Sequence, residues 1–221
     1  MRFHVITIFP DVLREYFNSS ILKRAQEKKR ISITIHNLRD FSKDRHRKVD
    51  DRPYGGGAGM VFAVAPIVRA VRSIKKMGKS KIIITSASGK QLSKKIARRW
   101  ARLYDNMIII CGHYEGIDER VKKILGAREV SVGPYILTGG ELPAMIIIDA
   151  VSRHIPGVLG KRESLEEVKG SYPVYTRPEV IRYKKKMFRV PPALISGDHK
   201  KIAAWRLARS RNIDNLSIDS S

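Results

Sequence analysis

Short apolar runs alternate with amphipathic helical patterns along most of the chain, and this alternation constrains the fold more than any other feature. Two of the runs, Lys81–Thr85 and Met107–Cys111, are rich in isoleucine and do not alternate with polar residues. Strands of this kind are covered on both faces, as in a parallel sheet between helices. Ile31–His36 does alternate, which predicts an outer, half-exposed strand. We therefore expect an α/β fold built on a mostly parallel sheet.

The other expected elements follow the same alternation. Strands are expected at Phe3–Phe9 and Glu129–Gly133, and one helix is expected to open at Pro10 and to end in the basic run at residues 28–30. Three further helices are expected in this part of the chain: Leu92–Tyr104, Ile117–Leu125 and residues 141–154. The first of these has a basic face, which is typical of a solvated helix surface. Together these elements predict one main domain over residues 1–160.

The composition changes after residue 160. Residues 161–172 are charged and lack a clear period, so we expect an interdomain linker there. Residues 173–221 are dense in basic side chains and contain one amphipathic segment, Asp198–Arg211. The expected apolar anchors of that helix are Ile202, Trp205 and Leu207. We predict a small, basic, largely helical C-terminal domain.

The charge of the chain indicates its partner. There are 44 Lys and Arg against 21 Asp and Glu, a formal net charge of +23, yet 43% of the residues are hydrophobic. This combination excludes a disordered polycation and indicates a folded protein with a polyanionic partner. Nucleic acid comes first among such partners and an anionic membrane second.

Several classes of protein and of site are excluded. The single cysteine, Cys111, cannot form an internal disulfide, and the six scattered histidines offer no spacing for a zinc site, so no metal site is expected. No apolar run approaches the roughly 20 residues that span a bilayer, so we expect a cytoplasmic protein without a membrane partner. The segment Gly78–Ser80 lacks the earlier glycine of a P-loop, and there is no GxGxxG motif for a dinucleotide.

Glycines cluster in three connecting segments. The first, residues 50–60, is either a plain flexible loop or, with the basic cluster at residues 44–48, a segment that seeks phosphate. The second, Cys111–Arg120, follows a central strand, where ligands of open α/β sheets bind. Glu115 within it either meets a ribose hydroxyl or ammonium group or begins the next helix. With the third, Val132–Pro143, these segments suggest a cofactor held mainly by main-chain contacts.

Longer strings in and around these segments carry a resemblance to a known family. They are Val49–Gly57, Tyr114–Arg120, Leu137–Ala144, Asp149–Arg153 with Ile155–Leu159, and Tyr175–Pro178. In these strings and in their order, the chain resembles the TrmD family of bacterial tRNA (guanine-N1)-methyltransferases. The resemblance extends from the first strand to the helix that contains Trp205.

The resemblance implies a SPOUT-type fold with a deep trefoil knot, a homodimer, and S-adenosylmethionine bound in the knot. The partner that it implies is tRNA rather than DNA, and residues 173–221 would form the tRNA-binding domain. Mg²⁺ is an ion that the family uses. The implied activity is methyl transfer to N1 of the guanine immediately 3′ of the anticodon. Since the cofactor is already an activated donor, the protein chiefly has to position donor and acceptor.

Site residues follow from the same resemblance. The residues that would line or adjoin the cofactor are Gly112, Tyr114, Glu115, Val132, Gly133, Pro134, Tyr135, Ile136, Leu137, Gly139, Gly140 and Pro143. Arg153 matches the family's catalytic arginine, which contacts the target guanine. The loop that would approach the anticodon contributes Arg45, His46, Asp50 and Arg52.

The chain departs from the family at the general base. The family has an aspartate in an Asp-Ser-Phe string of its linker, whereas Ser164–Gly170 is shorter and contains no such string. Glu167 and Glu166 are the candidates for the carboxylate, with Glu167 favoured by its distance from Ser164; the alternative is a solvated, charged linker. The chain departs from the family at three further positions. His113 stands where the family usually has arginine, Pro134 where it often has aspartate, and Ala87 where a proline commonly borders the cofactor.

Three functions are therefore to be compared. The first is a tRNA guanine-N1 methyltransferase that uses S-adenosylmethionine. The second is a related SPOUT methyltransferase with another RNA target. The third is an RNA-binding protein of this fold with weakened catalysis, which the altered linker keeps open.

Overall fold

The computed structural model describes residues 1–75, 77–159 and 172–210. The chain divides into two compact units, Met1–Leu159 (the N-terminal unit) and Gly160–Ser221 (the C-terminal unit). Among the described residues, no helix is long and apolar enough to cross a membrane. Most of the expected linker, residues 161–171, lies outside the described part of the chain.

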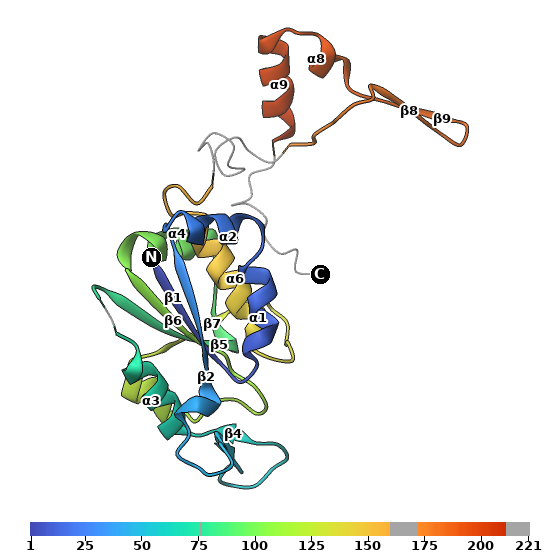
Figure 1. The fold of residues 1–221 in the computed structure, drawn as a ribbon. Coiled ribbons are helices and arrows are strands. Elements are labelled where there is room, and N and C mark those ends of the chain that lie inside the picture. Colours follow the sequence, from blue (N-terminus) through green and yellow to red (C-terminus); the bar gives the residue numbers. More distant parts are fainter. Residues whose placement is uncertain (76, 160–171, 211–221) are drawn as a thin grey trace. The chain divides into compact units, whose positions relative to one another are not determined.

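The N-terminal unit is built on a five-stranded parallel sheet with the strand order β2-β1-β6-β5-β7 (Figure 1). Its strands are β1 (Arg2–Thr7), β2 (Ser32–Asn37), β5 (Ser80–Gln91), β6 (Asn106–Ile110) and β7 (Arg128–Ser131). All residues of β6 are buried in the centre, whereas β2 lies at an edge and is only partly covered. The predicted α/β fold with a parallel sheet is confirmed, and so are the central and outer positions expected from the two kinds of apolar pattern.

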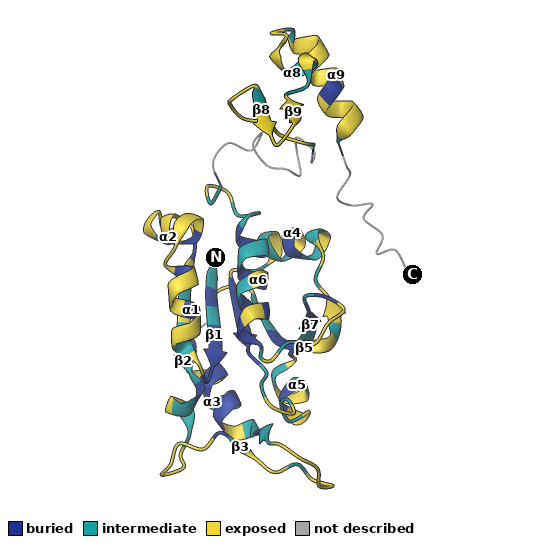
Figure 2. Ribbon diagram, turned by 90° about the vertical axis from the view of Figure 1, so that its right-hand side faces the viewer, coloured by how far each residue is buried: buried dark blue, intermediate teal, exposed yellow. Residues whose placement is uncertain are grey.

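Helices cover both faces of this sheet (Figure 2). One layer consists of α1 (Pro10–Phe17), α2 (Ser20–Glu27), α4 (Lys94–Leu103) and α6 (Glu141–Ser152). The other consists of η1 (Leu38–Phe41), α3 (Val64–Ser73) and α5 (Arg120–Leu125). Successive strand residues point to opposite faces, so Val5 packs in the first layer and Ile6 in the second.

Three helices differ from the expectation. The first predicted helix is divided into α1 and α2 at Asn18, which ends α1 as its C-cap. Helix α5 begins at Arg120 rather than Ile117, because Ile117 forms a parallel bridge with Phe62 and the Asp118 N–H donates to the Phe62 carbonyl at 3.1 Å. Helix α3 was not predicted, although its buried residues have helical spacing.

In its described residues, 172–210, the C-terminal unit combines a hairpin with two helices. Its elements are β8 (Val180–Tyr183), β9 (Lys186–Arg189), α8 (Pro192–Ile195) and α9 (His199–Arg209). The expected final helix is present, and the Asp198 carboxylate caps it by accepting from the backbone N–H groups of Lys200 and Lys201. Trp205 is buried, but Leu207 is 79% exposed, so the expectation that Leu207 anchors the helix was wrong. Two residues along a helix are about 200° apart, which places Leu207 on the opposite face from Trp205.

The hairpin of β8 and β9 was not predicted either. Its two strands pair antiparallel, with Tyr183 opposite Lys186. The turn between them contains Lys184 and Lys185 instead of the asparagine or glycine that normally marks a two-residue hairpin turn. Residues 172–210 are therefore less helical than the composition of this part of the chain suggested.

Candidate active site

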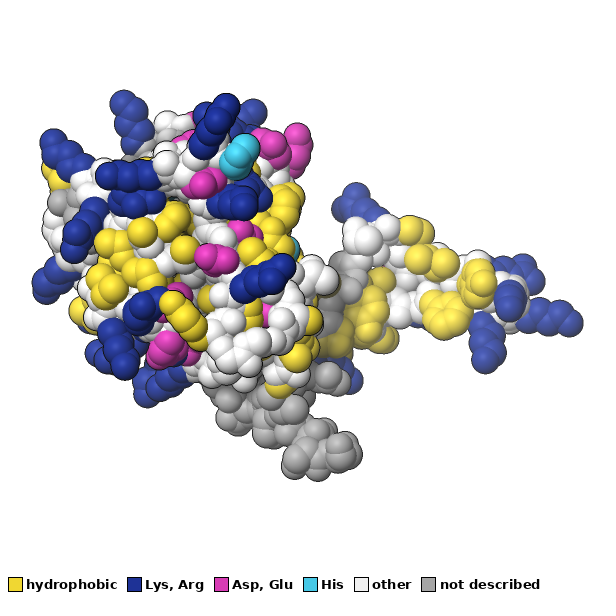
Figure 3. Space-filling model, turned by 90° about the horizontal axis from the view of Figure 1, so that it is seen from below, with side chains coloured by type: hydrophobic (Ala, Val, Ile, Leu, Met, Phe, Trp, Pro, Cys, Tyr) yellow, Lys and Arg dark blue, Asp and Glu magenta, His cyan; other side chains and the backbone are white. Residues whose placement is uncertain are grey.

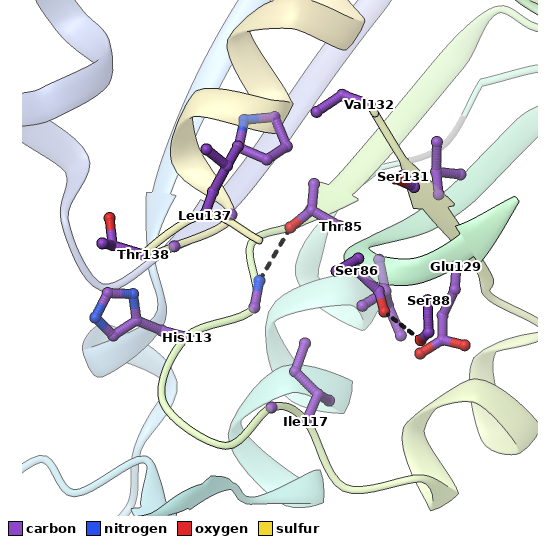
Figure 4. A pocket seen from close by; sticks show the side chains of 18 of the residues that line it. Thr85, Ser86, Ser88, His113, Ile117, Glu129, Ser131, Val132, Leu137 and Thr138 are labelled. Atoms are coloured by element: carbon purple, nitrogen blue, oxygen red, sulfur yellow. Dashed lines mark hydrogen bonds between the residues drawn. The ribbon is translucent and has the colours of Figure 1, made fainter. Parts of the chain in front are cut away.

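A cavity of about 380 Å³ lies at the carboxyl ends of β6 and β7, beside the register shift within β5 (Figure 4). Its lining comes from residues 84–88, 112–117, 129–132 and 137–140, with Lys122, Tyr135 and Pro143. Ligands of open parallel sheets bind at this edge. The second and third glycine segments thus meet in one site, as their positions after strands of the same sheet led us to expect.

Strand β5 supplies a wall of the cavity, of which the sequence analysis indicated only Ala87. The β5–β7 pairing shifts register between Thr85 and Lys90, so the residues between them leave the ladder. Ser86 and Ser88 then line the cavity, with their hydroxyl oxygens 2.9 Å apart (Figure 4). Irregularities of this kind often re-aim side chains beside a site. The predicted strand Lys81–Thr85 ends just before these two serines, but no motif in the sequence indicates that Ser86 and Ser88 line a site.

Main-chain groups lock the strand-end segments together. The Gly112 N–H donates to Thr85 Oγ1 at 3.1 Å, and the Gly140 N–H donates to the Gly112 carbonyl at 2.8 Å (Figure 4). A Cβ on Gly140 would overlap the Thr85 side chain and would lie 2.6 Å from the Gly112 nitrogen. Glycine at position 140 is therefore required by this close approach, and it brings the start of α6 against the end of β6.

His113 lines the cavity and has one buried ring nitrogen. Its Nδ1 is buried and has no hydrogen-bond partner among the described residues. Its ring meets Tyr114 and Phe9 edge to face, with centroids 4.8 and 5.1 Å apart. Tyr114 itself has a φ of +56°, a left-handed conformation that is unusual for a non-glycine residue and often found at functional sites. A buried nitrogen without a partner costs about 1–3 kcal/mol, so this site suits a ligand that supplies a polar group.

Two carboxylates, Glu115 and Glu129, line the cavity, and Lys122 in the same lining pairs with Glu129. Glu129 lies 2.9 Å from Lys122 Nζ, and Lys122 also lies 2.7 Å from Glu119, so these two acids raise the pKa of Lys122. Glu115 is exposed at the cavity and, since α5 begins only at Arg120, does not start the next helix. The chemistry of this lining fits S-adenosylmethionine, which carries a positive sulfonium and an ammonium group.

The structure places most of the predicted cofactor residues around this cavity. They are Gly112, Tyr114, Glu115, Val132, Tyr135, Leu137, Gly139, Gly140 and Pro143. Gly133, Pro134 and Ile136 do not line it; Gly133 is buried, and Ile136 is 88% exposed. Half of the string from Val132 to Leu137 therefore lines the cavity.

The first glycine segment, residues 50–60, is held beside the cavity where its two ends meet. The ladder of β3 (Asp50–Asp51) and β4 (Val61–Phe62) closes it, and the Phe62 N–H donates to the Gly116 carbonyl at 3.0 Å. At the C-terminal end of the segment, the Glu115 N–H donates to the Met60 carbonyl at 3.1 Å. A Cβ on Gly59 would lie 2.6 Å from Glu115 Cγ. The first and second glycine segments are therefore in direct contact.

The predicted RNA-contact residues belong to this loop and to the turn before it. Arg45, His46 and Arg52 are exposed, and Asp50 is partly buried in β3. Asp44 organises the turn: its Oδ1 accepts from the backbone N–H groups of His46 at 2.8 Å and Lys48 at 3.2 Å. These bonds lower the pKa of Asp44 and keep the carboxylate ionised.

Arg153 is separated from the cavity. It is the C-cap of α6, where its N–H donates to the Asp149 carbonyl at 3.1 Å, whereas the cavity lies at the N-terminal end of the same helix. Twelve helical residues at about 1.5 Å each separate the two ends by roughly 18 Å. The candidate bases Glu166 and Glu167 lie outside the described residues. In the described part of the chain, no three His, Cys, Asp or Glu side chains form a potential metal site.

Comparisons with known proteins agree with this geometry. The family model described as tRNA (Guanine-1)-methyltransferase TrmD matches residues 1–216. A tRNA (guanine-N(1)-)-methyltransferase of Carboxydothermus hydrogenoformans is 49% identical over 215 residues, which cover 95% of this chain and 83% of that protein. One from Clostridioides difficile is 45% identical over 221 residues, covering 96% of this chain and 94% of its own. The chain therefore belongs to the TrmD family of tRNA (guanine-1)-methyltransferases, with the SPOUT-type α/β fold of that family.

Proposed function

We propose that this protein transfers a methyl group from S-adenosylmethionine to N1 of the guanine immediately 3′ of the anticodon in tRNA. The observation that carries the proposal is the cavity at the ends of β6 and β7, which Gly112 and Gly140 close with main-chain contacts in a chain of the TrmD family. The tRNA substrate agrees with the net charge of +23.

The cavity is proposed to hold the cofactor through backbone groups of residues 112 and 132–140, with Glu115 beside its positive groups. When bound, S-adenosylmethionine supplies the activated methyl group. His113 Nδ1, which has no partner among the described residues, is proposed to hydrogen-bond a polar group of the cofactor. The protein's part is then to fix the position of the donor and to keep water out.

The acceptor has to be activated as well. Guanine N1 carries a proton and becomes a good nucleophile only when that proton leaves. Glu167 or Glu166 is proposed to remove it, and Arg153 to stabilise the negative charge that develops at O6. The target base also has to leave the anticodon-loop stack to reach these groups. Mg²⁺ enters the proposal from the family resemblance; loss of transfer on chelation and its recovery on adding Mg²⁺ is the expected result.

A homodimer is part of the proposal because one chain does not bring its own Arg153 to its own cavity. The face of α1 and α6 exposes apolar side chains: Val12 at 57%, Leu142 at 49%, Tyr16 at 39% and Ile146 at 37%. The Tyr16 hydroxyl donates to Asp149 at 2.7 Å and ties the two helices into one surface. A second copy on this face, related by a two-fold axis, is proposed to bring its Arg153 to the cavity.

Methyl transfer from labelled S-adenosylmethionine to two tRNA transcripts tests the function. One transcript carries the guanine 3′ of the anticodon, and the other carries adenine at that position. Label only in the first transcript supports the proposal. Label in both favours the related methyltransferase with another target, and tRNA binding without label favours the RNA-binding protein.

The general base is tested with a double substitution, Glu166→Gln with Glu167→Gln. Removing a general base is expected to lower kcat about 10²–10⁴-fold, with tRNA affinity little changed. Glu163→Gln, in the same charged segment, is the matched control and should keep full activity. A double variant that transfers methyl at the normal rate would remove both glutamates from the mechanism.

A further inference from the structure

The β8–β9 hairpin has an aromatic face that stays largely exposed among the described residues of its unit. Ile181 lies opposite Phe188, and Tyr183 lies opposite Lys186, so these four side chains share one face of the ladder. Tyr183 is 64% exposed, and Ile181 and Phe188 are each 54% exposed. An isolated two-stranded hairpin is only marginally stable in water. This face therefore gains stability when a partner covers it.

The tip of the hairpin is strongly basic. Residues 180–189 contain five cations and no carboxylate: Arg182, Lys184, Lys185, Lys186 and Arg189. Lys184 has a φ of +54°, and its Nζ lies 5.7 Å from the centroid of the Tyr183 ring. A left-handed lysine costs about 1–2 kcal/mol relative to glycine, so the turn accepts strain and carries positive charge at its apex.

The aromatic and basic groups form one surface. Tyr183, Phe188 and the three consecutive lysines line a shallow hollow of about 570 Å³. In Figure 3 the segment that extends to the right, which is the hairpin of Figure 1, carries hydrophobic side chains beside Lys and Arg side chains. An uncharged protein surface would leave these cations unpaired, whereas single-stranded nucleic acid offers flat bases for the rings and phosphates for the lysines.

We propose that this hairpin is an RNA-binding element. Tyr183 and Phe188 stack on unpaired bases of the RNA, and Lys184, Lys185 and Lys186 bind the neighbouring phosphates. The inference rests on the proposed function in that the RNA is the substrate tRNA. The hairpin would add a contact that binds exposed bases of any sequence. This contact is separate from the cavity proposed to hold the cofactor.

Binding of the full chain to the tRNA transcript, measured over a series of salt concentrations, tests this. Tyr183→Leu with Phe188→Leu keeps the apolar bulk but removes the stacking surface, and should weaken binding about tenfold or more. Met187→Leu, on the opposite face, is the matched control and should bind normally. Tyr183→Phe with Phe188→Tyr keeps both rings and should also bind normally, which separates stacking from misfolding.

Lys184→Gln, Lys185→Gln and Lys186→Gln together should lower the slope of log affinity against log salt by about 2–3, since each phosphate contact contributes about 0.7–0.9. In methyl transfer, both hairpin variants should raise KM for tRNA and leave kcat and cofactor affinity unchanged. Normal tRNA binding by the Tyr183→Leu, Phe188→Leu double variant overturns the proposal. A double variant that changes only the self-association of the protein also overturns it. The binding assay does not depend on methyl transfer. A chain that binds tRNA through the hairpin but transfers no methyl group would therefore refute the proposed function and leave the hairpin proposal standing.

Discussion

At the scale of single residues, Gly140 shows most directly how closely the site is packed. A methyl group there would meet the backbone of Cys111 and Gly112, at 2.7 and 2.6 Å, and backbone cannot move aside as the end of a side chain can. At Gly139 the nearest atoms belong to the side chains of Glu141 and His113. These neighbouring glycines therefore differ in what a Cβ would displace.

Gly140→Ala is accordingly expected to destabilise the fold by about 1–3 kcal/mol, as overpacking does, and to abolish measurable cofactor binding. Gly139→Ala should weaken cofactor binding less, because the first atoms that its Cβ would meet belong to side chains rather than to the backbone. Thermal unfolding and calorimetric titration with S-adenosylmethionine measure both effects. Equal losses in the two variants would contradict the role assigned to the backbone contact.

A second residue-scale prediction concerns pH. His4 Nδ1 lies 3.1 Å from His36 Nε2 across the β1–β2 pair, and burial, His36 and Arg2 lower the pKa of His4 to about 4. The unfolded chain binds this proton near pH 6.5, so the stabilising effect of a neutral His4 is complete above that pH. It is lost as the pH falls from 6.5 to 4.

Chemical denaturation at several pH values checks this expectation. His4→Gln should flatten part of the fall in unfolding free energy between pH 6.5 and 4. It should not flatten all of it, because burial also lowers the pKa of His36. Parallel curves for the variant and the original chain would show that His4 does not titrate as described.

At the scale of elements, a buried carboxylate joins β1 to α6. Thr7 Oγ1 donates to Glu141 Oε1 at 2.6 Å and accepts from the Phe9 N–H at 2.8 Å, and Thr7 and Glu141 are both buried. Thr7→Val leaves the carboxylate without this donor and should cost about 1.5–3 kcal/mol of unfolding free energy. Thr7→Ser keeps the hydroxyl and should cost only about 1 kcal/mol for the lost methyl. A valine variant as stable as the serine one would show that the bond contributes little.

The elements also show which parts of the fold the sequence could predict. Burial on both faces leaves a β-branched run without alternation, so β6 could be predicted from residues 107–111 alone. The segment 86–89 could not, since only the pairing of β5 with β7 reveals that it leaves the ladder. The hairpin at residues 180–189 was missed because its turn consists of lysines, and composition alone favoured helix. The deep knot implied by the family stays a prediction.

The site could be predicted further than the fold, because its motifs are contiguous strings. Most residues of the strings at 112–115 and 132–143 line the cavity, yet Ser86 and Ser88 carry no motif and were missed. The separation of Arg153 from the cavity, in contrast, could have been predicted. The helix expected at residues 141–154 already places Arg153 at one end and the third glycine segment at the other.

At the scale of the whole molecule, the distance between Arg153 and the cavity predicts shared sites. A chain with Gly140→Ala lacks a working cavity, and a chain with Arg153→Ala lacks the arginine, so each alone should be inactive. Mixed under conditions that exchange subunits, half of the dimers carry one intact site, and about a quarter of the original activity should return. A mixture that stays as inactive as its components would show that each chain completes its own site.

The charge of +23 acquires a more specific meaning at this scale. It supplies affinity for tRNA that falls with salt and says little about which base is chosen. In the proposed mechanism, the choice of atom belongs to the cavity, to Arg153 and to the glutamate that would remove the proton.

The position of the transferred methyl group on the tRNA therefore tests the account most directly. After reaction with S-adenosylmethionine, nuclease digestion and mass spectrometry identify the modified nucleoside and its place in the sequence. The account predicts one methyl group per tRNA, on N1 of the guanine immediately 3′ of the anticodon. A methyl group on a ribose 2′-hydroxyl, on another base or at another position would contradict it.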